Sequence, residues 1–268
     1  MANLPLIFYS KRVSQLYNNQ PLLGQLTAAL NKRKLHHANL LSSGPGEEGL
    51  VVGLALAARI LCDTQKHCGN CKSCKQTSAL QHPDLHFSFP FVSGGAAGTA
   101  DDFLADFRAS LEENKYLDPD SWQQNITSKN QQLLIPVKEI QNIHKKLSLT
   151  AASGKNRVLL LWMPERIKSA APNRLLKLIE EPLPKTYIIL VTHHKARLLP
   201  TIVSRCAPWH CKPLKELHFI THFKDQPEAT AKLLSMVFAP NLGAAISANV
   251  NTEPTQIDAF ALWMRVCS

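Results

Sequence analysis

A short apolar strand, a glycine-rich turn and an apolar helix follow one another in residues 38–61, and this order restricts the possible folds most. The strand pattern covers Ala38–Ser42, the turn is Gly44-Pro45-Gly46, and the helix pattern runs over 49–61. Strand, glycine-rich turn and helix form the layout of a nucleotide-binding βα unit. The chain is therefore expected to contain a parallel sheet whose strands alternate with helices.

Further hydrophobic patterns extend this α/β arrangement along the chain. Period and composition predict an extended segment at 84–92, strands at 157–162, 187–192 and 207–211, and helices at 12–35, 101–115, 136–147, 169–181 and 197–205. Pro21 can divide the first of these helices. After Pro213 the strand patterns stop, and residues 214–250 read as helices broken near Pro227 and Pro240. We expect an α/β domain over 1–212, a small all-helical lid domain over 213–252, and the start of a further domain over 253–268.

Composition excludes several classes of protein. The 268 residues carry a formal net charge of +10, which permits contact with nucleic acid or acidic proteins, although the basic residues are spread along the chain. No apolar run reaches the roughly 18 residues of a membrane span, and the N-terminus does not resemble a signal peptide. We therefore expect a cytoplasmic protein without a membrane partner.

The turn after the first strand matches a phosphate-binding loop only in part. Gly44 and Gly49 have the spacing of the pattern G-x-x-x-x-G-K-[ST], but Leu50 and Val51 stand where the lysine and the hydroxyl residue belong. Neither side chain can meet phosphates or hold Mg²⁺. Glu47 and Glu48 add negative charge beside the site. Gly44 and Gly49 are thus candidate nucleotide-binding residues of a degenerate loop, and the alternative is a simple turn.

The strand at 157–161 lacks the acid that an ATP-hydrolysing protein needs. Such strands end in an aspartate that reaches Mg²⁺, followed in many cases by a glutamate that polarises water. Here the strand runs into Trp162-Met163-Pro164-Glu165, and Glu165 comes too late to act at the strand tip. Two separate losses predict that this chain neither binds ATP as a cofactor nor hydrolyses it.

A cluster of cysteines predicts a metal site. The four thiols are Cys62, Cys68, Cys71 and Cys74. Four thiolates suit tetrahedral Zn²⁺, and four protein ligands leave no open position for water, so the metal would be structural. Free or redox-active thiols are the alternative reading. We expect His67 and His82 to be plain surface residues rather than ligands, and the remaining cysteines to be core or surface thiols: Cys206, Cys211 and Cys267.

Two longer segments carry a resemblance to a known family. Residues 173–182 resemble the motif N-x-L-L-K-x-x-E-E-P, residues 198–206 resemble L-L-P-T-I-x-S-R-C, and His37-Ala38 precedes the first strand as in the same proteins. These motifs are similar to those of bacterial DNA polymerase III clamp-loader subunits, which are AAA+ proteins, and the similarity covers about 22–212. Trp162 lies where active members carry their metal-binding aspartate. Loss of both ATP motifs fits the delta-prime branch rather than the gamma and tau ATPases.

The resemblance implies a fold and a role. The fold would be an AAA+ (RecA-like) parallel sheet flanked by helices, with a zinc-binding insertion and a helical lid, and residues 253–268 would begin a truncated C-terminal collar domain. Arg205 would be an arginine finger that acts in trans on ATP held by a neighbouring gamma or tau subunit. The other implied partners are the delta subunit, the sliding clamp and primer–template DNA. Alternatively, Arg205 is a surface residue that caps a helix.

Three other functions remain open at this point. An ATP-hydrolysing gamma-type subunit or another AAA+ motor would need a lysine at Leu50 and an aspartate at Trp162. A zinc-dependent DNA-binding protein would place aromatic residues among the cysteines, and none lies between 62 and 74. A purely structural interaction module would leave a partner's ATPase unchanged when Arg205 is lost.

Overall fold

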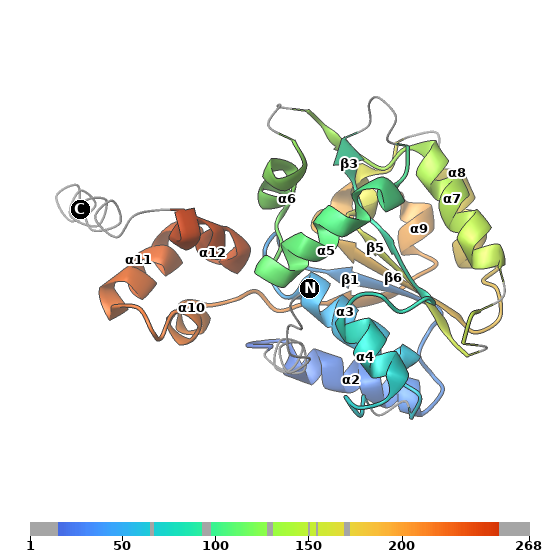
Figure 1. Ribbon diagram of the computed structural model, residues 1–268, viewed down its shortest axis with the longest axis horizontal. Coiled ribbons are helices and arrows are strands. Elements are labelled where there is room, and N and C mark those ends of the chain that lie inside the picture. Colours follow the sequence, from blue (N-terminus) through green and yellow to red (C-terminus); the bar gives the residue numbers. More distant parts are fainter. Residues whose placement is uncertain are drawn as a thin grey trace, which may run out of the picture.

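A central sheet with helices on both faces forms the body of the protein (Figure 1). The computed structural model describes residues 16–64, 67–92, 98–127, 131–149, 151–153, 155–168 and 172–251. Three further helices stand beside the body near the end of the described chain. No helix within these residues is both long and apolar enough to cross a lipid bilayer.

The main sheet has five parallel strands in the order β2-β5-β6-β1-β7. Their bounds are β1 Ala38–Ser42, β2 Leu85–Ser88, β5 Arg157–Trp162, β6 Thr186–Thr192 and β7 Ala207–His210. Ser42 at the end of β1 lies opposite Thr192 of β6 and His210 of β7. The carboxyl ends of three neighbouring strands therefore meet beside the loop that follows β1. This sheet confirms the expected α/β fold, whose central strands are continuous apolar runs because helices cover both faces.

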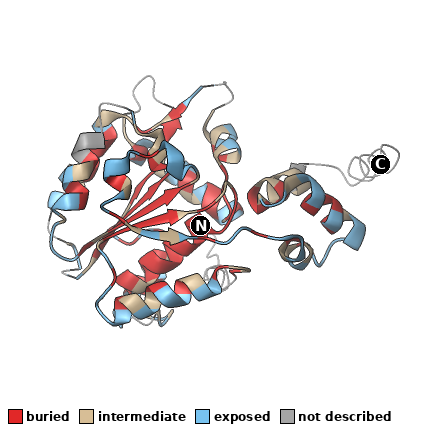
Figure 2. Cartoon of the chain, turned by 180° about the vertical axis from the view of Figure 1, so that it is seen from behind, coloured by how far each residue is buried: buried red, intermediate tan, exposed pale blue. Residues whose placement is uncertain are grey.

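Each face of the sheet has its own hydrophobic layer (Figure 2). Leu41 and Leu160 point to the layer that holds α3 (Gly49–Leu61), which α2 (Gln20–Asn31) covers. Leu40 and Leu161, their neighbours in sequence, point to the opposite layer. This alternation follows from the two-residue period of a strand. The helices of the second layer are α7 Val137–Ser148, α8 Pro172–Glu180 and α9 Pro200–Val203.

The first described helix is shorter than the sequence suggested. Residues 16–19 are not helical, and α2 begins at Gln20. Pro21 occupies the first turn, where its missing N–H costs no hydrogen bond and its fixed φ favours the helix. The expected single helix over 12–35 therefore begins later among the described residues, with Pro21 at its start, and residues 12–15 lie outside the described residues.

Several elements between α3 and β5, before and after β2, lie outside the main sheet. They are α4 Lys72–Ser78, β3 Phe91–Val92, the 3-10 helix η1 Ala100–Phe103, α5 Leu104–Glu113, α6 Pro119–Ile126 and β4 Leu133–Leu134, with β3 and β4 antiparallel. Helix α6 was not expected from the sequence. Asp118 caps it by accepting the N–H groups of Asp120 and Ser121 at 3.0 and 3.1 Å. Trp122, fully buried, donates to the Pro90 carbonyl at 2.7 Å and fixes α6 to the body.

The helices after β7 fall where the sequence predicted helices, and we call α10–α12 the lid. Their bounds are α10 Glu216–His222, α11 Glu228–Phe238 and α12 Leu242–Asn251. The breaks lie at Pro227 and Pro240, as expected from proline's missing N–H. The predicted helix near the end of the chain and the further domain over 253–268 lie outside the described residues. The division at 212 and 252 stays a prediction.

Candidate functional site

The loop after β1 folds around one of its own carboxylates. Glu47 Oε2 accepts the Gly44 N–H at 2.8 Å and the Ser43 hydroxyl at 3.2 Å. Ser43 Oγ in turn accepts the Gly49 N–H at 3.1 Å. Backbone amides at this position are the groups that a phosphate-binding loop offers to its ligand. An internal anion therefore already uses donors that a phosphate would need, and burial raises the pKa of Glu47 even though the Gly44 and Ser43 contacts oppose it.

The second glutamate of the loop points away from the loop and towards the segment before α2. Glu48 is fully buried, and its Oε2 accepts the backbone N–H groups of Asn18 at 3.0 Å and Asn19 at 2.9 Å. The Asn19 side-chain amide donates to the same oxygen at 2.8 Å, and the Tyr17 N–H bonds Oε1. Glu48 thus joins the start of α3 to the start of α2, a structural role that the sequence alone did not reveal.

The tip of β5 carries an indole where an active AAA+ protein would carry an acid. The Trp162 N–H donates to His193 Nε2 at 2.9 Å, and His193 Nδ1 lies 3.1 Å from the Ser43 carbonyl oxygen. Because Nε2 accepts, the proton lies on Nδ1 and is donated to that carbonyl. Burial lowers the pKa of His193, which keeps the ring neutral. This neutral bridge ties β5, β6 and the loop together, and sequence reasoning missed His193 although it directly follows an apolar strand.

Glu165 lies at the tip of β6 rather than that of β5. The chain turns through Met163, which has a φ of +58°, and the 3-10 helix η2 (Pro164–Arg166). The Glu165 carboxylate then accepts the Thr192 hydroxyl at 2.7 Å and the His193 N–H at 2.9 Å. The hydroxyl of Thr192, the last residue of β6, is therefore bonded to a carboxylate of its own chain.

The lid is packed against the same loop. The Gly243 N–H of α12 donates to the Gly46 carbonyl at 3.0 Å, and the Asn114 amide donates to the Gly243 carbonyl at 3.0 Å. Gly46 has a φ of +63°, and a Cβ there would lie 1.6 Å from Asn241 Oδ1. Both the backbone conformation and the close approach require glycine. A cleft of about 530 Å³ remains beside the loop, and Glu47 forms part of its wall together with Ser43, Gly44, His193, Lys195 and His210.

Arg205 lies in the turn between α9 and β7 with 41% of its side chain exposed. Its Nε forms an ion pair with Glu180 at the end of α8, and its Nη1 donates to the Thr201 carbonyl at 3.0 Å. The expected arginine is thus on the surface, at the end of the sheet from which β7 starts. The carboxyl ends of the strands and the loop lie at the opposite end. It does not join the chain's own loop residues in one site.

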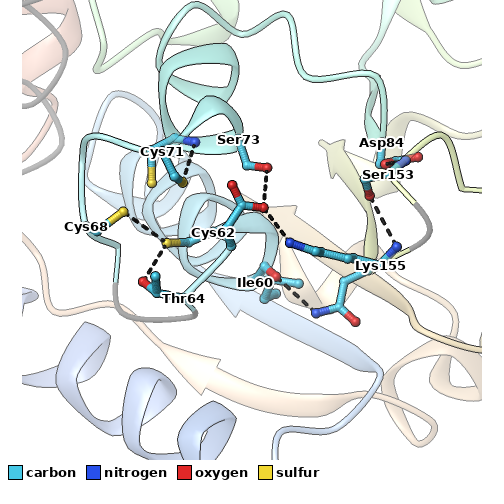
Figure 3. Close-up of polar contacts among 12 residues, drawn as sticks. Ile60, Cys62, Thr64, Cys68, Cys71, Ser73, Asp84, Ser153 and Lys155 are labelled. Atoms are coloured by element: carbon cyan, nitrogen blue, oxygen red, sulfur yellow. Dashed lines mark hydrogen bonds and ion pairs between the residues drawn. The ribbon is translucent and has the colours of Figure 1, made fainter.

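The structure brings the four cysteines together at the end of α3 (Figure 3). The sulfur atoms of Cys62, Cys68, Cys71 and Cys74 all lie within 4.8 Å of one another, and Cys62 Sγ is 3.8 Å from Cys68 Sγ. Zinc–sulfur bonds of about 2.3 Å in a tetrahedron imply sulfur–sulfur distances of about 3.8 Å. The donor set therefore fits a tetrahedral thiolate-binding ion.

Neighbouring residues support the cysteine cluster. Cys71 Sγ accepts the Cys74 N–H at 3.3 Å at the start of α4. Asp63 accepts from Ser73 Oγ at 3.0 Å and pairs with Lys155 Nζ at 2.7 Å, which connects the cluster to the segment before β5 (Figure 3). The hydrogen bond from Lys155, with those from the cluster side, lowers the pKa of Asp63 to about 2.

The remaining sequence predictions near the cluster have mixed outcomes. His82 is buried, with 4% exposed, because its Nδ1 accepts the Asp84 N–H at 3.1 Å, so the expectation of a surface residue is wrong. Cys206 and Cys211 are buried away from the cluster. Burial raises the pKa of their thiols to about 11 and about 12, which leaves them protonated and unreactive. Cys267 lies outside the described residues.

The sheet order, the glycine loop at the end of the inner strand β1 and the helical lid on that loop define an AAA+ module. A sequence model of the family described as DNA polymerase III, delta subunit, matches residues 18–215. The chain belongs to this family.

Two curated relatives agree with this assignment. The chain is 30% identical over 233 residues to the DNA polymerase III subunit delta' of Haemophilus influenzae, covering 85% of this chain and 58% of the relative. It is 30% identical over 191 residues to the subunit of the same name from Yersinia pestis, covering 69% and 44%. A gamma-subunit-related DNA polymerase III protein of Thermotoga maritima aligns with a TM-score of 0.42 and 16% identity over 88% of this chain and 75% of that one. The chain thus spans about half the length of the curated relatives it matches.

Proposed function

We propose that this chain is the non-hydrolysing, or stator, subunit of a bacterial DNA polymerase III clamp loader, and that it supplies Arg205 in trans to a neighbouring ATPase subunit. One contrast carries the proposal: donors of the chain's own loop are taken by Glu47, while Arg205 is exposed far from that loop. Such a chain cannot use its arginine on its own nucleotide. If this arginine acts on a triphosphate, the nucleotide must be held by a neighbouring subunit.

The chemistry of the loop supports the absence of a nucleotide on this subunit. Leu50 and Val51, in place of the lysine and hydroxyl of a working loop, are each only 2% exposed and belong to the core. Trp162 replaces the metal-binding acid with an indole whose N–H is bonded to His193, so this position offers Mg²⁺ no oxygen ligand. Gly44 and Gly49 keep their spacing but serve the hydrogen bonds around Glu47 and Ser43.

Arg205 suits the role in trans. A guanidinium is always charged and presents paired donors that match phosphate oxygens. In the transition state of phosphoryl transfer such a group stabilises the charge that spreads over the γ-phosphate. The neighbour would be the gamma or tau ATPase of the loader, and the delta subunit, the sliding clamp and primer–template DNA would be met through the assembly. The setting would be the bacterial cytoplasm.

The four cysteines would hold a structural zinc ion. Their four thiolates would complete the coordination shell, so the ion would supply cross-linking rather than catalysis. The ion would fasten the end of α3 to the start of α4, where Cys62 and Cys71 cap the two helices.

The proposal is tested by Arg205→Ala in a loader assembled from this chain and its ATPase partners. In the partner subunits, every ATP site except the one that faces this chain is inactivated. Hydrolysis at that site is expected to fall by about a thousandfold, as for other arginine fingers. Arg197→Ala, which removes another exposed arginine, in η3 (Lys195–Arg197), serves as the control for loss of a positive charge. An unchanged rate with Arg205→Ala in a fully assembled loader would refute the role in trans.

A further inference from the structure

The guanidinium of Arg205 is held at two of its edges by groups of its own chain. On one edge Nε forms the ion pair with Glu180. On another, Nη1 donates to the Thr201 carbonyl at 3.0 Å and lies 3.5 Å from the Ser204 hydroxyl. Two attachments on different edges fix the plane of a rigid group, whereas one attachment would let it rotate.

The attachments leave part of the donor set of Arg205 for a ligand. A guanidinium has five N–H donors, one on Nε and two on each Nη. Glu180 uses the Nε donor and Thr201 uses one Nη1 donor. No bond to Nη2 occurs among the described residues. An open hollow of about 490 Å³ adjoins the side chain, lined by His36, His37, Ile179, Glu180, Ser204 and Arg205.

Glu180 is itself placed by the fold. It is the last residue of α8, and α8 packs against α9 on the same face of the sheet (Figure 1). His37 Nε2 donates to the Ile179 carbonyl at 2.7 Å, which fixes the end of α8 to the segment that enters β1. The position of the Glu180 carboxylate is therefore fixed by α8 and by the bond from His37, both of which are attached to the sheet.

We propose that Glu180 is a positioning residue for Arg205: it holds the guanidinium plane so that Nη2 faces a phosphate oxygen of the neighbouring subunit. This inference rests on the proposed function of Arg205. Both side chains are about 40% exposed, with values of 41% and 42%, and exposed ion pairs of this kind contribute little to stability. Glu180 should therefore matter for the rate at the neighbouring ATP site and hardly at all for the folding of this chain.

The test compares Glu180→Ala with Glu181→Ala in the assembled loader, with hydrolysis measured at the ATP site that faces this chain. Glu181 is the adjacent exposed carboxylate, and the substitution Glu181→Ala removes the same charge from the same helix end. For Glu180→Ala we expect kcat to decrease about two- to fivefold, which is the free energy of an exposed ion pair expressed as a rate. The KM for ATP and the thermal midpoint of the chain are expected to stay constant. Equal effects of the two substitutions would overturn the proposal, because they would reveal only a general charge effect.

Two further readouts separate positioning from structure. In an Arg205→Ala background Glu180→Ala is expected to cause no additional loss, since Glu180 acts through Arg205. In the isolated chain, the Arg205 Nε–H should exchange with water several-fold faster in Glu180→Ala than in the wild type or in Glu181→Ala, as followed by NMR. Additive losses or unchanged exchange would refute the inference. A loader that tolerates Arg205→Ala would instead refute the proposed function on which it rests.

Discussion

Deleting the Glu48 carboxylate should destabilise this protein far more than deleting that of Glu47, its neighbour in the loop. Glu48 receives four donors: the N–H groups of Tyr17, Asn18 and Asn19, and the Asn19 side-chain amide. Asn19 is only 1% exposed, so in Glu48→Ala its backbone N–H would be left buried without a partner, and its side-chain amide would lose one of its two bonds and keep the one to the Lys212 carbonyl. At about 1–3 kcal/mol for each unsatisfied buried group, the expected loss is about 4 kcal/mol.

Glu47→Ala is the matched control for this substitution. It frees only the Gly44 N–H and the Ser43 hydroxyl, which border the cleft where water can reach them. Burial already raises the pKa of Glu47, so removal of its carboxylate also relieves a cost. We expect a change in the free energy of unfolding within about 1 kcal/mol. Urea unfolding with a constant m-value would measure both variants. Equal losses, or a loss below about 1 kcal/mol for Glu48→Ala, would refute the structural role of Glu48.

Three further predictions concern the metal, the lid and pH. The purified chain should contain one zinc ion, which Cys71→Ser should lose and Cys206→Ser should retain. Metal analysis after gel filtration measures the zinc content, and zinc retained in Cys71→Ser would exclude the four-cysteine cluster as the metal site. Gly243→Ala should loosen the lid and speed proteolysis before α10, because the new Cβ would lie 1.9 Å from the Tyr116 carbonyl oxygen. The control, Gly24→Ala, has open space around it in α2 and should stabilise the chain by up to about 1 kcal/mol. Equal behaviour of the two variants would contradict the close contact at Gly243. Burial, with a smaller contribution from Lys115, lowers the pKa of His222 to about 4, below its ordinary 6.5, so its contribution is complete above pH 6.5 and is lost as pH falls through about 4. His222→Asn should therefore reduce the acid sensitivity of unfolding between these values by at most about 3 kcal/mol, and an unchanged pH profile would show that the ring is not buried in solution.

The sequence predicted most of the fold because its signals were local and strong. The apolar runs of β5 and β6 have no polar interruption, that of β1 contains only Asn39, and prolines mark the breaks between the lid helices. Helix α6 was missed because it has only eight residues and depends on the Asp118 cap and on the bond from Trp122 to the distant Pro90 carbonyl. The start of α2 was misplaced because Pro21 suits a first turn as well as a break.

The candidate site was predictable in its losses but not in what replaced them. Leu50 and Trp162 occupy the motif positions of the phosphate-binding lysine and the metal-binding aspartate, so the loss of both groups could be predicted from the sequence. The bonds from Glu47 to Gly44 and from Trp162 to His193 join residues through the folded loop, and nothing in the sequence specifies them. The cysteines could be grouped from spacing alone, since two residues separate Cys68 from Cys71 and Cys71 from Cys74. The pairing of Glu180 with Arg205 depends on the packing of α8 on α9, which sequence spacing does not reveal.

The measurement that tests the central claim most directly is a titration of the isolated chain with a fluorescent ATP analogue and Mg²⁺. The filled loop, the buried Leu50 and the indole at Trp162 predict no saturable binding up to millimolar nucleotide. Saturable binding with a micromolar Kd would contradict the stator account, because the Glu47 carboxylate would then have to leave the loop for a phosphate.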